Sequence, residues 1–325
     1  MLRRGIQKSV GNMAKGVRFN STASAPAASV ANPVSSLAVV GAGQMGVGIA
    51  YVAAANAKVP VQLVDSNEKS LAKGTSFVDK MLAKNVSKGK ITEQDAKDIK
   101  SRITGSLDLK SAVKDVDMVI EAVPEIPDLK ASIFKTLEEA TKSDAILGTN
   151  TSSISITRIA SSCVNPAAAS RVIGAHFMNP VPVQKGVEII RGLQTSDEVL
   201  ARTNEFIARM GKIVSNSEDS PGFLANRVLM PYINEAIITV ETGVGKKEDV
   251  DSIMKNGCAM PMGPLQLADF IGLDTCLAIM EVLYRDTGDS KYRPSVLLKK
   301  YVDAGWLGVK TGRGFYNYEQ AGAKL

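Results

Sequence analysis

A glycine-rich turn between two apolar runs constrains this chain more than any other stretch. Residues 37–40 (LAVV) are apolar, residues 41–46 read G-A-G-Q-M-G, and residues 47–56 have a composition that favours a helix. A second apolar run at 61–64 ends on Asp65. A lone G-x-G-x-x-G is weak evidence, but here a strand, a helix, a second strand and an acid lie where a dinucleotide-binding fold needs them.

Each part of this motif has a physical role in such a fold. The first glycine permits a tight turn, the second lets the backbone approach a pyrophosphate, and the third lets the helix pack close to the strand. Free N–H groups at the helix start attract phosphate, and a carboxylate after the second strand accepts hydrogen bonds from a ribose diol while repelling a 2′-phosphate. The motif therefore predicts NAD rather than NADP; the alternative is a glycine turn with only a structural role. The residues expected at this cofactor are Gly41, Gly43, Gln44, Met45, Gly46 and Asp65.

Apolar runs continue to alternate with helix-like segments up to about residue 176. The runs at 118–120, 145–148 and 172–175 lead into polar residues that include Glu125, Ser152 and His176. This alternation predicts an α/β fold of the Rossmann type with a mostly parallel sheet. Because the carboxyl ends of parallel strands share one edge, we expect these three side chains along one rim.

Two helices are expected between Asp65 and the run at 118–120. They span about 67–87 and 91–103, and Thr92 is a good N-cap for the second. The end of the first helix and the loop after it carry three lysines, at positions 84, 88 and 90, that could bind the phosphates of a large anionic substrate. We assign Lys88 to substrate binding on this ground; the alternative is that these lysines are merely solvated.

The strand signals stop after about residue 217. Helical patterns follow at 223–241, 247–256, 265–285 and 295–304. This change of class predicts a Rossmann-type domain at 37–218 and an all-helical domain at 219–325. Apolar residues in the helical domain, such as Met260, Met262 and Phe270, favour a symmetric interface, so we expect a homodimer.

The single histidine of the chain, His176, lies twelve positions before Glu188. An imidazole that exchanges a proton near neutral pH, with an acid within a hairpin's reach, predicts a general acid–base pair. The alternative is a core histidine, because spacing alone does not prove that two side chains meet.

The formal net charge of +6 is concentrated at the N-terminus. The first acidic residue is Asp65, and five basic residues lie within the first eighteen positions: Arg3, Arg4, Lys8, Lys15 and Arg18. The rest is close to neutral, which argues against a nucleic-acid partner. A basic leader without acids predicts a mitochondrial targeting peptide and linker at 1–36, and hence a mitochondrial matrix protein; the alternative is a basic tail that stays in place.

Two further classes of protein are disfavoured. No apolar run is long enough to predict a membrane span. The cysteines Cys163, Cys258 and Cys276 are odd in number and widely separated. With only one histidine beside them, neither a disulfide framework nor a metal site is expected.

Six motifs together resemble the L-3-hydroxyacyl-CoA dehydrogenases, in the order in which that family has them. They are N-T-S-S at 150–153, H-F-M-N-P-V-P at 176–182, V-E at 187–188, D-S-P-G-F-L-A-N-R at 219–227, P-M-G-P-L-Q-L-A-D at 261–269 and K-T-G-R-G-F-Y at 310–316. The similarity covers everything after the linker, and the form is most similar to the short 3-hydroxybutyryl-CoA type.

The resemblance implies a role for each matching residue. His176 would be the catalytic base and Glu188 its partner, while Ser152 and Asn226 would hold the oxygens of an acyl-CoA substrate. The residues implied to border the cofactor are Glu125, Lys130, Ser152, Asn179 and Lys310. From position alone, Ser152 and Asn226 could equally cap helices or bridge backbone groups.

These observations favour NAD-dependent oxidation of an L-3-hydroxyacyl-CoA to the 3-ketoacyl-CoA, in fatty-acid β-oxidation or short-chain metabolism. Two alternatives stay open. One is a dehydrogenase of free hydroxy acids, which needs no site for CoA phosphates. The other is a dinucleotide-binding sensor without catalysis, which has no need of His176 together with Glu188.

Overall fold

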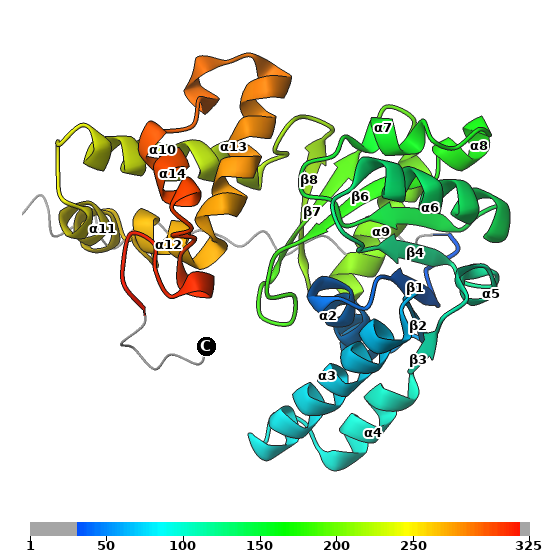
Figure 1. Cartoon of the computed structure of the whole chain (residues 1–325). Coiled ribbons are helices and arrows are strands. Elements are labelled where there is room, and N and C mark those ends of the chain that lie inside the picture. Colours follow the sequence, from blue (N-terminus) through cyan, green and yellow to red (C-terminus); the bar gives the residue numbers. More distant parts are fainter. Residues whose placement is uncertain (1–30, 319–325) are drawn as a thin grey trace, which may run out of the picture. The chain divides into compact units, whose positions relative to one another are not determined.

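The computed structural model describes residues 31–318, and an eight-stranded sheet forms the centre of their first part (Figure 1). The strand order is β3-β2-β1-β4-β5-β6-β7-β8, and every neighbouring pair is parallel except β6 and β7. The strands are β1 (Leu37–Val40), β2 (Val61–Val64), β3 (Ile103–Ser106), β4 (Met118–Glu121), β5 (Ile146–Thr149), β6 (Val172–Phe177), β7 (Gly186–Arg191) and β8 (Ile213–Glu218).

Helices cover both faces of this sheet, because its central strands are buried on both sides. Alternate residues of β1 enter two different hydrophobic clusters: Leu37 and Val39 pack with α2, α3 and α9, whereas Ala38 and Val40 pack with α5, α6 and α7. The helices are α2 (Gln44–Val52), α3 (Glu68–Ser87), α4 (Glu93–Ser101), α5 (Leu109–Val113), α6 (Pro127–Ala140), α7 (Ile156–Ala160), α8 (Pro166–Ala169) and α9 (Asp197–Arg209).

Local signals explain most helix boundaries, and two boundaries differ from the sequence prediction. Thr92 caps α4 in a capping box with Asp95, as expected. The helix predicted to reach residue 103 ends at Ser101, because the chain joins the sheet as β3 at Ile103. The helix expected at 47–56 begins earlier, as α2 at Gln44, and continues as a π-helix at Ala53–Ala57. It ends before Lys58, whose φ is 57°.

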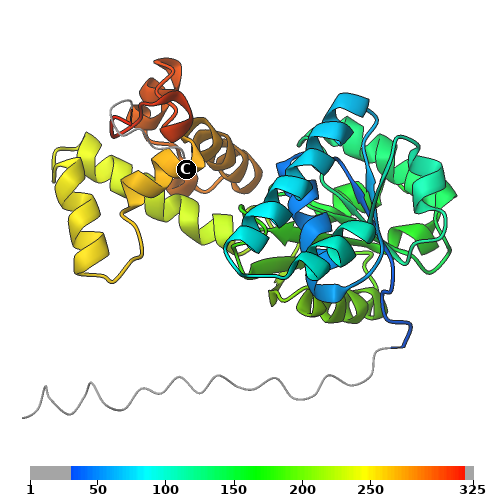
Figure 2. The ribbon, with the colours of Figure 1, turned by 90° about the horizontal axis from the view of Figure 1, so that it is seen from below.

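The second part of the chain is helical, as the yellow-to-red helices of Figure 2 show. It has a third hydrophobic cluster of its own. Its helices are α10 (Ala225–Glu241), α11 (Lys247–Asn256), α12 (Pro264–Ile271), α13 (Leu273–Thr287) and α14 (Val296–Asp303). The single helix expected at 265–285 is two helices, because Gly272 between them has φ 104°. The predicted fold class, a Rossmann-type sheet followed by helices, is confirmed.

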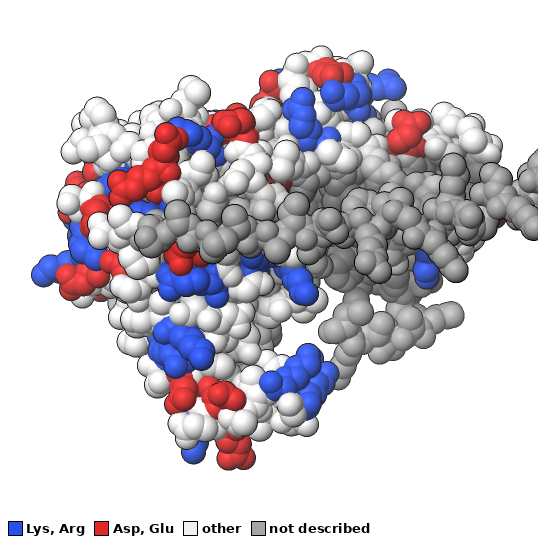
Figure 3. Space-filling model, turned by 180° about the vertical axis from the view of Figure 1, so that it is seen from behind, with Lys and Arg blue, Asp and Glu red and all other residues white. Residues whose placement is uncertain are grey.

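The fold includes residues that we expected in the linker. Val34 is fully buried, and the Asp117 carboxylate accepts hydrogen bonds from the Ser35 backbone N–H and from the hydroxyls of Ser35 and Ser36. Elsewhere on the surface, acidic and basic side chains are interspersed over the part of the face in Figure 3 that is not grey. None of the helices within residues 31–318 has both the length and the apolar character needed to cross a bilayer.

Candidate active site

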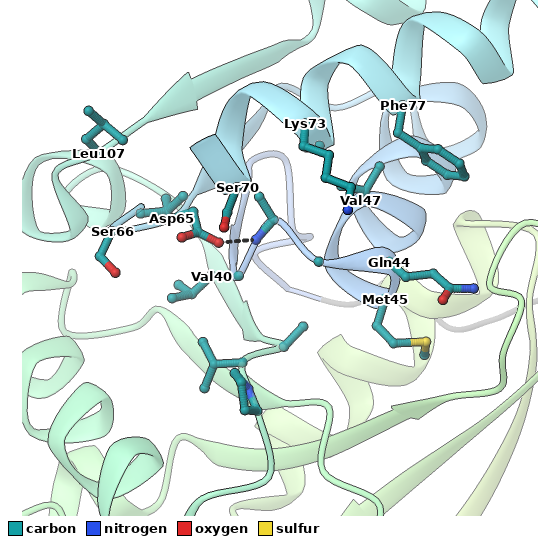
Figure 4. A pocket seen from close by; sticks show the side chains of 18 of the residues that line it. Val40, Gln44, Met45, Val47, Asp65, Ser66, Ser70, Lys73, Phe77 and Leu107 are labelled. Carbon is teal, nitrogen blue, oxygen red and sulfur yellow. Dashed lines mark hydrogen bonds between the residues drawn. The ribbon is translucent and has the colours of Figure 1, made fainter. Parts of the chain in front are cut away.

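The glycine turn forms one wall of a pocket of about 1180 Å³ (Figure 4). The pocket is lined by the turn itself, by the end of β2, by α3 and by the segment after β4. No side chain caps the N-terminus of α2, and its first turn carries no acid. This end of the helix is therefore suited to an anion such as the pyrophosphate of a dinucleotide.

The three glycines of the motif stand in different surroundings. A Cβ on Gly46 would lie 1.8 Å from the Gly41 carbonyl oxygen, so a side chain there would force the helix and the turn apart. Gly41 has φ 108°, a conformation that favours glycine. A Cβ on Gly43 would meet nothing within 4 Å. The protein itself thus requires the first and third glycines, whereas the space beside Gly43 fits a closely approaching cofactor.

Asp65 lies at the end of β2 in the same pocket. Its Oδ2 accepts a hydrogen bond from the Ala42 N–H at 2.9 Å, and its Oδ1 accepts one from Asn67 N–H at 2.9 Å. Each carboxylate oxygen has a second lone pair for a ribose hydroxyl. Asp65 therefore both fixes the glycine turn and presents a negative charge to the pocket, and this donor and acceptor set fits NAD.

His176 and Glu188 are directly opposed residues of the antiparallel pair β6 and β7. Directly opposed side chains of such a pair lie on the same face of the sheet and within contact distance. The His176 Nδ1 lies 2.8 Å from Glu188 Oε2, and both residues are buried. Sheet register therefore brings together the two residues that the sequence proposed as an acid–base pair.

The second oxygen of Glu188 holds the start of α10. Its Oε1 accepts hydrogen bonds from Leu224 N–H and Ala225 N–H, each at 2.8 Å. Burial alone would raise the pKa of Glu188, but hydrogen bonds from His176 and from this backbone outweigh it and hold the pKa below its ordinary value. The carboxylate therefore stays charged beside the imidazole at neutral pH.

Phe223 packs against the imidazole of His176. Its ring is edge-on to that of His176, with the ring centroids 6.0 Å apart, and it is 2% exposed. Its φ of 48° is unusual for a residue with a side chain. This conformation helps to turn the next two N–H groups toward Glu188.

Glu125 organises the turn that follows β5. Its Oε1 accepts hydrogen bonds from the Thr151 hydroxyl, from Ser152 N–H at 2.9 Å and from Ser153 N–H at 3.1 Å. Burial alone would raise the pKa of Glu125, but the ammonium of Lys130 and the donors of the turn outweigh it and hold the pKa below its ordinary value. The Ser152 hydroxyl lies 3.5 Å from this oxygen, too far for a strong hydrogen bond, which leaves the hydroxyl able to donate elsewhere.

Two asparagines join the elements around this turn. The Asn226 side chain, on α10, donates to the Ser152 carbonyl oxygen at 3.3 Å. The Asn179 side chain follows β6 at a cis peptide bond with Pro180, and its Oδ1 accepts a hydrogen bond from Gln44 Nε2 at 3.1 Å. The structure thus links Asn226 to Ser152, and Asn179 to the glycine motif.

Two residues implied to border the cofactor have other partners here. Lys130 is fully buried, with its ammonium 2.7 Å from a Glu121 oxygen. Lys310 lies in a short helical turn near the C-terminus, with its ammonium 2.6 Å from an Asp274 oxygen, and it does not line the pocket of the glycine turn. The structure does not bring either ammonium group to that pocket.

Three lysines at and after the end of α3 line a second cleft, of about 910 Å³. Lys84, Lys88 and Lys90 lie along it, and Gln44 lines both this cleft and the pocket of the glycine turn. The two spaces are therefore neighbours. Within residues 31–318, no group of three or more histidine, cysteine or acidic side chains is placed to hold a metal ion.

Comparison with known proteins agrees with this geometry. Residues 36–220 match the model of the NAD binding domain of 3-hydroxyacyl-CoA dehydrogenase, and residues 222–318 match that of its C-terminal domain. The chain belongs to the 3-hydroxyacyl-CoA dehydrogenase family. It is 51% identical to a probable 3-hydroxybutyryl-CoA dehydrogenase of Bacillus subtilis, over 88% of this chain and 98% of the relative. It is 50% identical to the 3-hydroxybutyryl-CoA dehydrogenase of Bradyrhizobium diazoefficiens, over 89% of this chain and 97% of the relative.

A solved structure gives the same result. The (S)-3-hydroxybutyryl-CoA dehydrogenase of Ralstonia eutropha superposes with a TM-score of 0.85 at 44% identity, over 88% of this chain and all of that one. The predicted family, the NAD cofactor and the NAD-dependent oxidation of a 3-hydroxyacyl-CoA are thereby confirmed.

The predicted location in the mitochondrial matrix is wrong. The dehydrogenases named above come from bacteria, which have no mitochondria. The targeting peptide that we expected lies outside the described residues. The basic, acid-free leader was the only ground for this prediction.

Two residues that pack around the side chains described above were not predicted from the sequence. Phe223 stood inside a recognised motif, but only its φ and its packing show that it covers His176. Glu121 ends an apolar strand and faces Thr149 in the sheet register. An acid at the end of a buried strand was the available signal, and its partners could not be read without the register.

Proposed function

We propose that His176 is the general base of this dehydrogenase and takes the proton of the substrate's 3-hydroxyl. The observation that carries this proposal is the 2.8 Å contact between His176 Nδ1 and a buried carboxylate on the facing strand. Because Glu188 is charged, it favours the tautomer in which Nδ1 carries the proton and its N–H donates a hydrogen bond to Oε2. The other ring nitrogen, Nε2, is then free to accept a proton.

Oxidation also removes a hydride from C3 of the substrate. NAD supplies the hydride acceptor when it is bound. The chain's own contribution is to remove the hydroxyl proton and to stabilise the resulting imidazolium with the Glu188 carboxylate. In the reverse direction the imidazolium returns the proton to the ketone oxygen.

Ser152 and Asn226 are proposed to hold the oxygens of the substrate. The Ser152 hydroxyl has no short bond to Glu125, and Asn226 is tied to the same turn through the Ser152 carbonyl. As donors to the C3 oxygen they stabilise charge that develops in the reaction. Ser152→Ala should therefore lower kcat more than it raises KM. A normal kcat with a lowered Tm would instead indicate a role in capping only.

The cleft beside α3 is proposed to hold the CoA part of the substrate. Lys84, Lys88 and Lys90 line it, and ammonium groups bind phosphate as point charges. Lys88→Ala should raise the KM for acetoacetyl-CoA and leave kcat nearly unchanged, because these phosphates are remote from the reacting carbon. The relatives named for 3-hydroxybutyryl-CoA favour a short acyl chain, and a place in fatty-acid β-oxidation or short-chain acyl-CoA metabolism.

A homodimer through the helical part is the proposed assembly. Ile253, Met260, Met262 and Phe270 are between 38% and 61% exposed on or beside α11 and α12. Exposed apolar side chains that lie near one another are typical of an interface. Analytical ultracentrifugation should give twice the chain mass, and Phe270→Glu should shift the protein toward the monomer. A monomeric wild type would refute this assembly.

One assay tests the proposed function as a whole. NADH consumption is measured with acetoacetyl-CoA, with its longer homologues and with free 3-keto acids. We expect turnover with the CoA thioesters, the highest kcat/KM for the shortest, and a loss of turnover in His176→Gln. Equal turnover of a free keto acid would remove the case for the CoA cleft.

A further inference from the structure

A carboxylate that plays no part in the proposed chemistry lies completely buried at the end of β4. Glu121 has no solvent exposure, and four short contacts surround it. It accepts hydrogen bonds from Val123 N–H at 2.7 Å and from the Thr149 hydroxyl at 2.7 Å. The Lys130 ammonium lies 2.7 and 2.9 Å from its two oxygens. A buried charge of this kind is costly unless it is fully paired, as this one is.

The Lys130 ammonium is shared unequally between two carboxylates. Glu121 binds it with both oxygens, whereas Glu125 reaches it with Oε2 only, at 3.3 Å. This leaves the other oxygen of Glu125 outside the ion pair. That oxygen is the one that accepts the N–H groups of Ser152 and Ser153.

We propose that Glu121 is a positioning residue for Ser152. Glu121 pairs with the ammonium of Lys130, so that Oε1 of Glu125 remains free to accept the N–H groups of the turn at 150–153. It acts through two other side chains and does not line the pocket of the glycine turn. This inference rests on the proposed function, because it assumes that the Ser152 hydroxyl contacts the substrate.

The effect of removing this charge follows from the contacts. In Glu121→Gln the Lys130 ammonium keeps a single charged partner, Glu125, because an amide oxygen is a weaker acceptor than a carboxylate. The ammonium then draws both oxygens of Glu125 toward itself. The N–H groups of Ser152 and Ser153 lose their acceptor, and the serine hydroxyl moves away from its place.

A double-mutant cycle on the full chain tests this route. The kcat and the KM for acetoacetyl-CoA are measured for wild type, Glu121→Gln, Ser152→Ala and the double variant. We expect Glu121→Gln to lower kcat by about tenfold in wild type, but by less than about twofold when Ser152 is already alanine. The KM should change by less than about threefold, because the CoA cleft is untouched.

The outcomes separate this inference from the proposed function. If Ser152→Ala has the kcat of wild type, the proposed role of Ser152 is wrong, and the proposed effect of Glu121 on Ser152 is wrong with it. The inference is overturned, and the proposed function stands, if Ser152→Ala is impaired but Glu121→Gln keeps the wild-type kcat. The same conclusion follows if the fold-decrease in kcat of the double variant equals the product of the decreases in the two single variants.

A matched control shows what a merely structural carboxylate does. Asp251 is 6% exposed and accepts hydrogen bonds from Leu265 N–H and Gln266 N–H at the start of α12. Asp251→Asn should lower Tm, and any loss of kcat should multiply fully with that of Ser152→Ala.

A milder variant covers the case in which Glu121→Gln does not fold. Thr149→Val removes one donor to Glu121 and keeps the shape of the side chain. It should give a smaller loss of kcat, about threefold, that again disappears in the Ser152→Ala background. A loss of the same size in both backgrounds would count against the inference.

Discussion

Replacing Glu188 by glutamine is the most direct test of the acid–base pair. The two oxygens of this carboxylate have different partners. Oε1 accepts two backbone N–H groups at the start of α10, each at 2.8 Å, and Oε2 faces His176 Nδ1. An amide has only one oxygen. Because two donors surround the Oε1 position, the amide oxygen of Glu188→Gln must occupy it, and the amide NH₂ must face the histidine.

This orientation forces the wrong tautomer on the neutral imidazole. Opposite an NH₂ group, Nδ1 of His176 must accept a hydrogen bond, so the ring proton moves to Nε2. A protonated Nε2 cannot take the proton of the 3-hydroxyl. In addition, the imidazolium loses its attraction to a carboxylate, which is about 4 kcal/mol for charges about 4 Å apart at an effective dielectric constant of about 20. We therefore expect kcat to fall on the order of 10² to 10³-fold.

The assay is steady-state oxidation of 3-hydroxybutyryl-CoA, followed by NADH absorbance, with Tm measured in parallel. The affinity for NAD, from a binding titration, is the control. It should stay within about threefold of wild type, because Glu188 does not line the pocket of the glycine turn. A folded Glu188→Gln variant with a kcat within about threefold of wild type would refute the reasoning.

Three further predictions concern the cofactor pocket and the start of the fold. Gly46→Ala should prevent folding or lower Tm strongly, whereas Gly43→Ala should keep the wild-type Tm and raise the Kd for NAD, as thermal melts and titration would show. Asp65→Asn should raise the KM for NAD by about 10- to 100-fold and increase the NADP-to-NAD ratio of kcat/KM, and an unchanged ratio would contradict this. Asp117→Asn should lower the free energy of unfolding by about 1 to 3 kcal/mol at neutral pH, as measured by urea unfolding. Burial alone would raise the pKa of Asp117, but Lys142 and the two serines hold it well below its ordinary value. That stability is present above the unfolded pKa of about 4 and is lost as pH falls toward the folded pKa, so the difference in Tm between the two proteins should shrink in acid, and a constant difference would be a contrary result.

The first part of the fold was readable from the sequence because its signals are local. The glycine motif, the apolar runs and the acid after the second run each lie within a few residues of the element that they define. The parallel sheet then follows from the alternation of strands and helices. Its carboxyl edge could be predicted to collect Glu125, Ser152 and His176 without any knowledge of which strands are neighbours.

The last two strands were less readable, because β7 and β8 lack the long apolar runs of the central strands. Strand β8 is mostly exposed, with the sequence I-V-S-N-S-E, and its composition does not distinguish it from a loop. The break at Gly272 was also missed, because a glycine inside an apolar periodic stretch can be tolerated in a helix at a cost of about 1 kcal/mol. Long-range pairing decides both cases.

Buried polar networks were the least readable feature. Lys130 is nine residues after Glu121, and both stand in segments that look ordinary in sequence. Their contact depends on where α6 lies against the sheet, and the contact of Glu121 with Thr149 depends on the register of β4 and β5. Hydrophobic periodicity gives no signal for either contact. The burial of Lys130, which the resemblance implied at the cofactor, was therefore not predicted.

The reversal of β7 explains why a pair so close in sequence can work as a unit. A parallel neighbour of β6 would need a crossover, which would separate His176 from its acid by a helix or more. The antiparallel turn instead places Glu188 opposite the imidazole through the sheet's own hydrogen bonds. The same carboxylate also receives the first N–H groups of α10, the helix that carries Asn226. The proposed proton transfer at His176 and the position of Asn226 beside Ser152 therefore depend on one side chain. Because the amide oxygen of Glu188→Gln still accepts these N–H groups, this change should disturb the acid–base chemistry and leave the seating of Asn226 in place, whereas a change at Ser152 should disturb substrate contact.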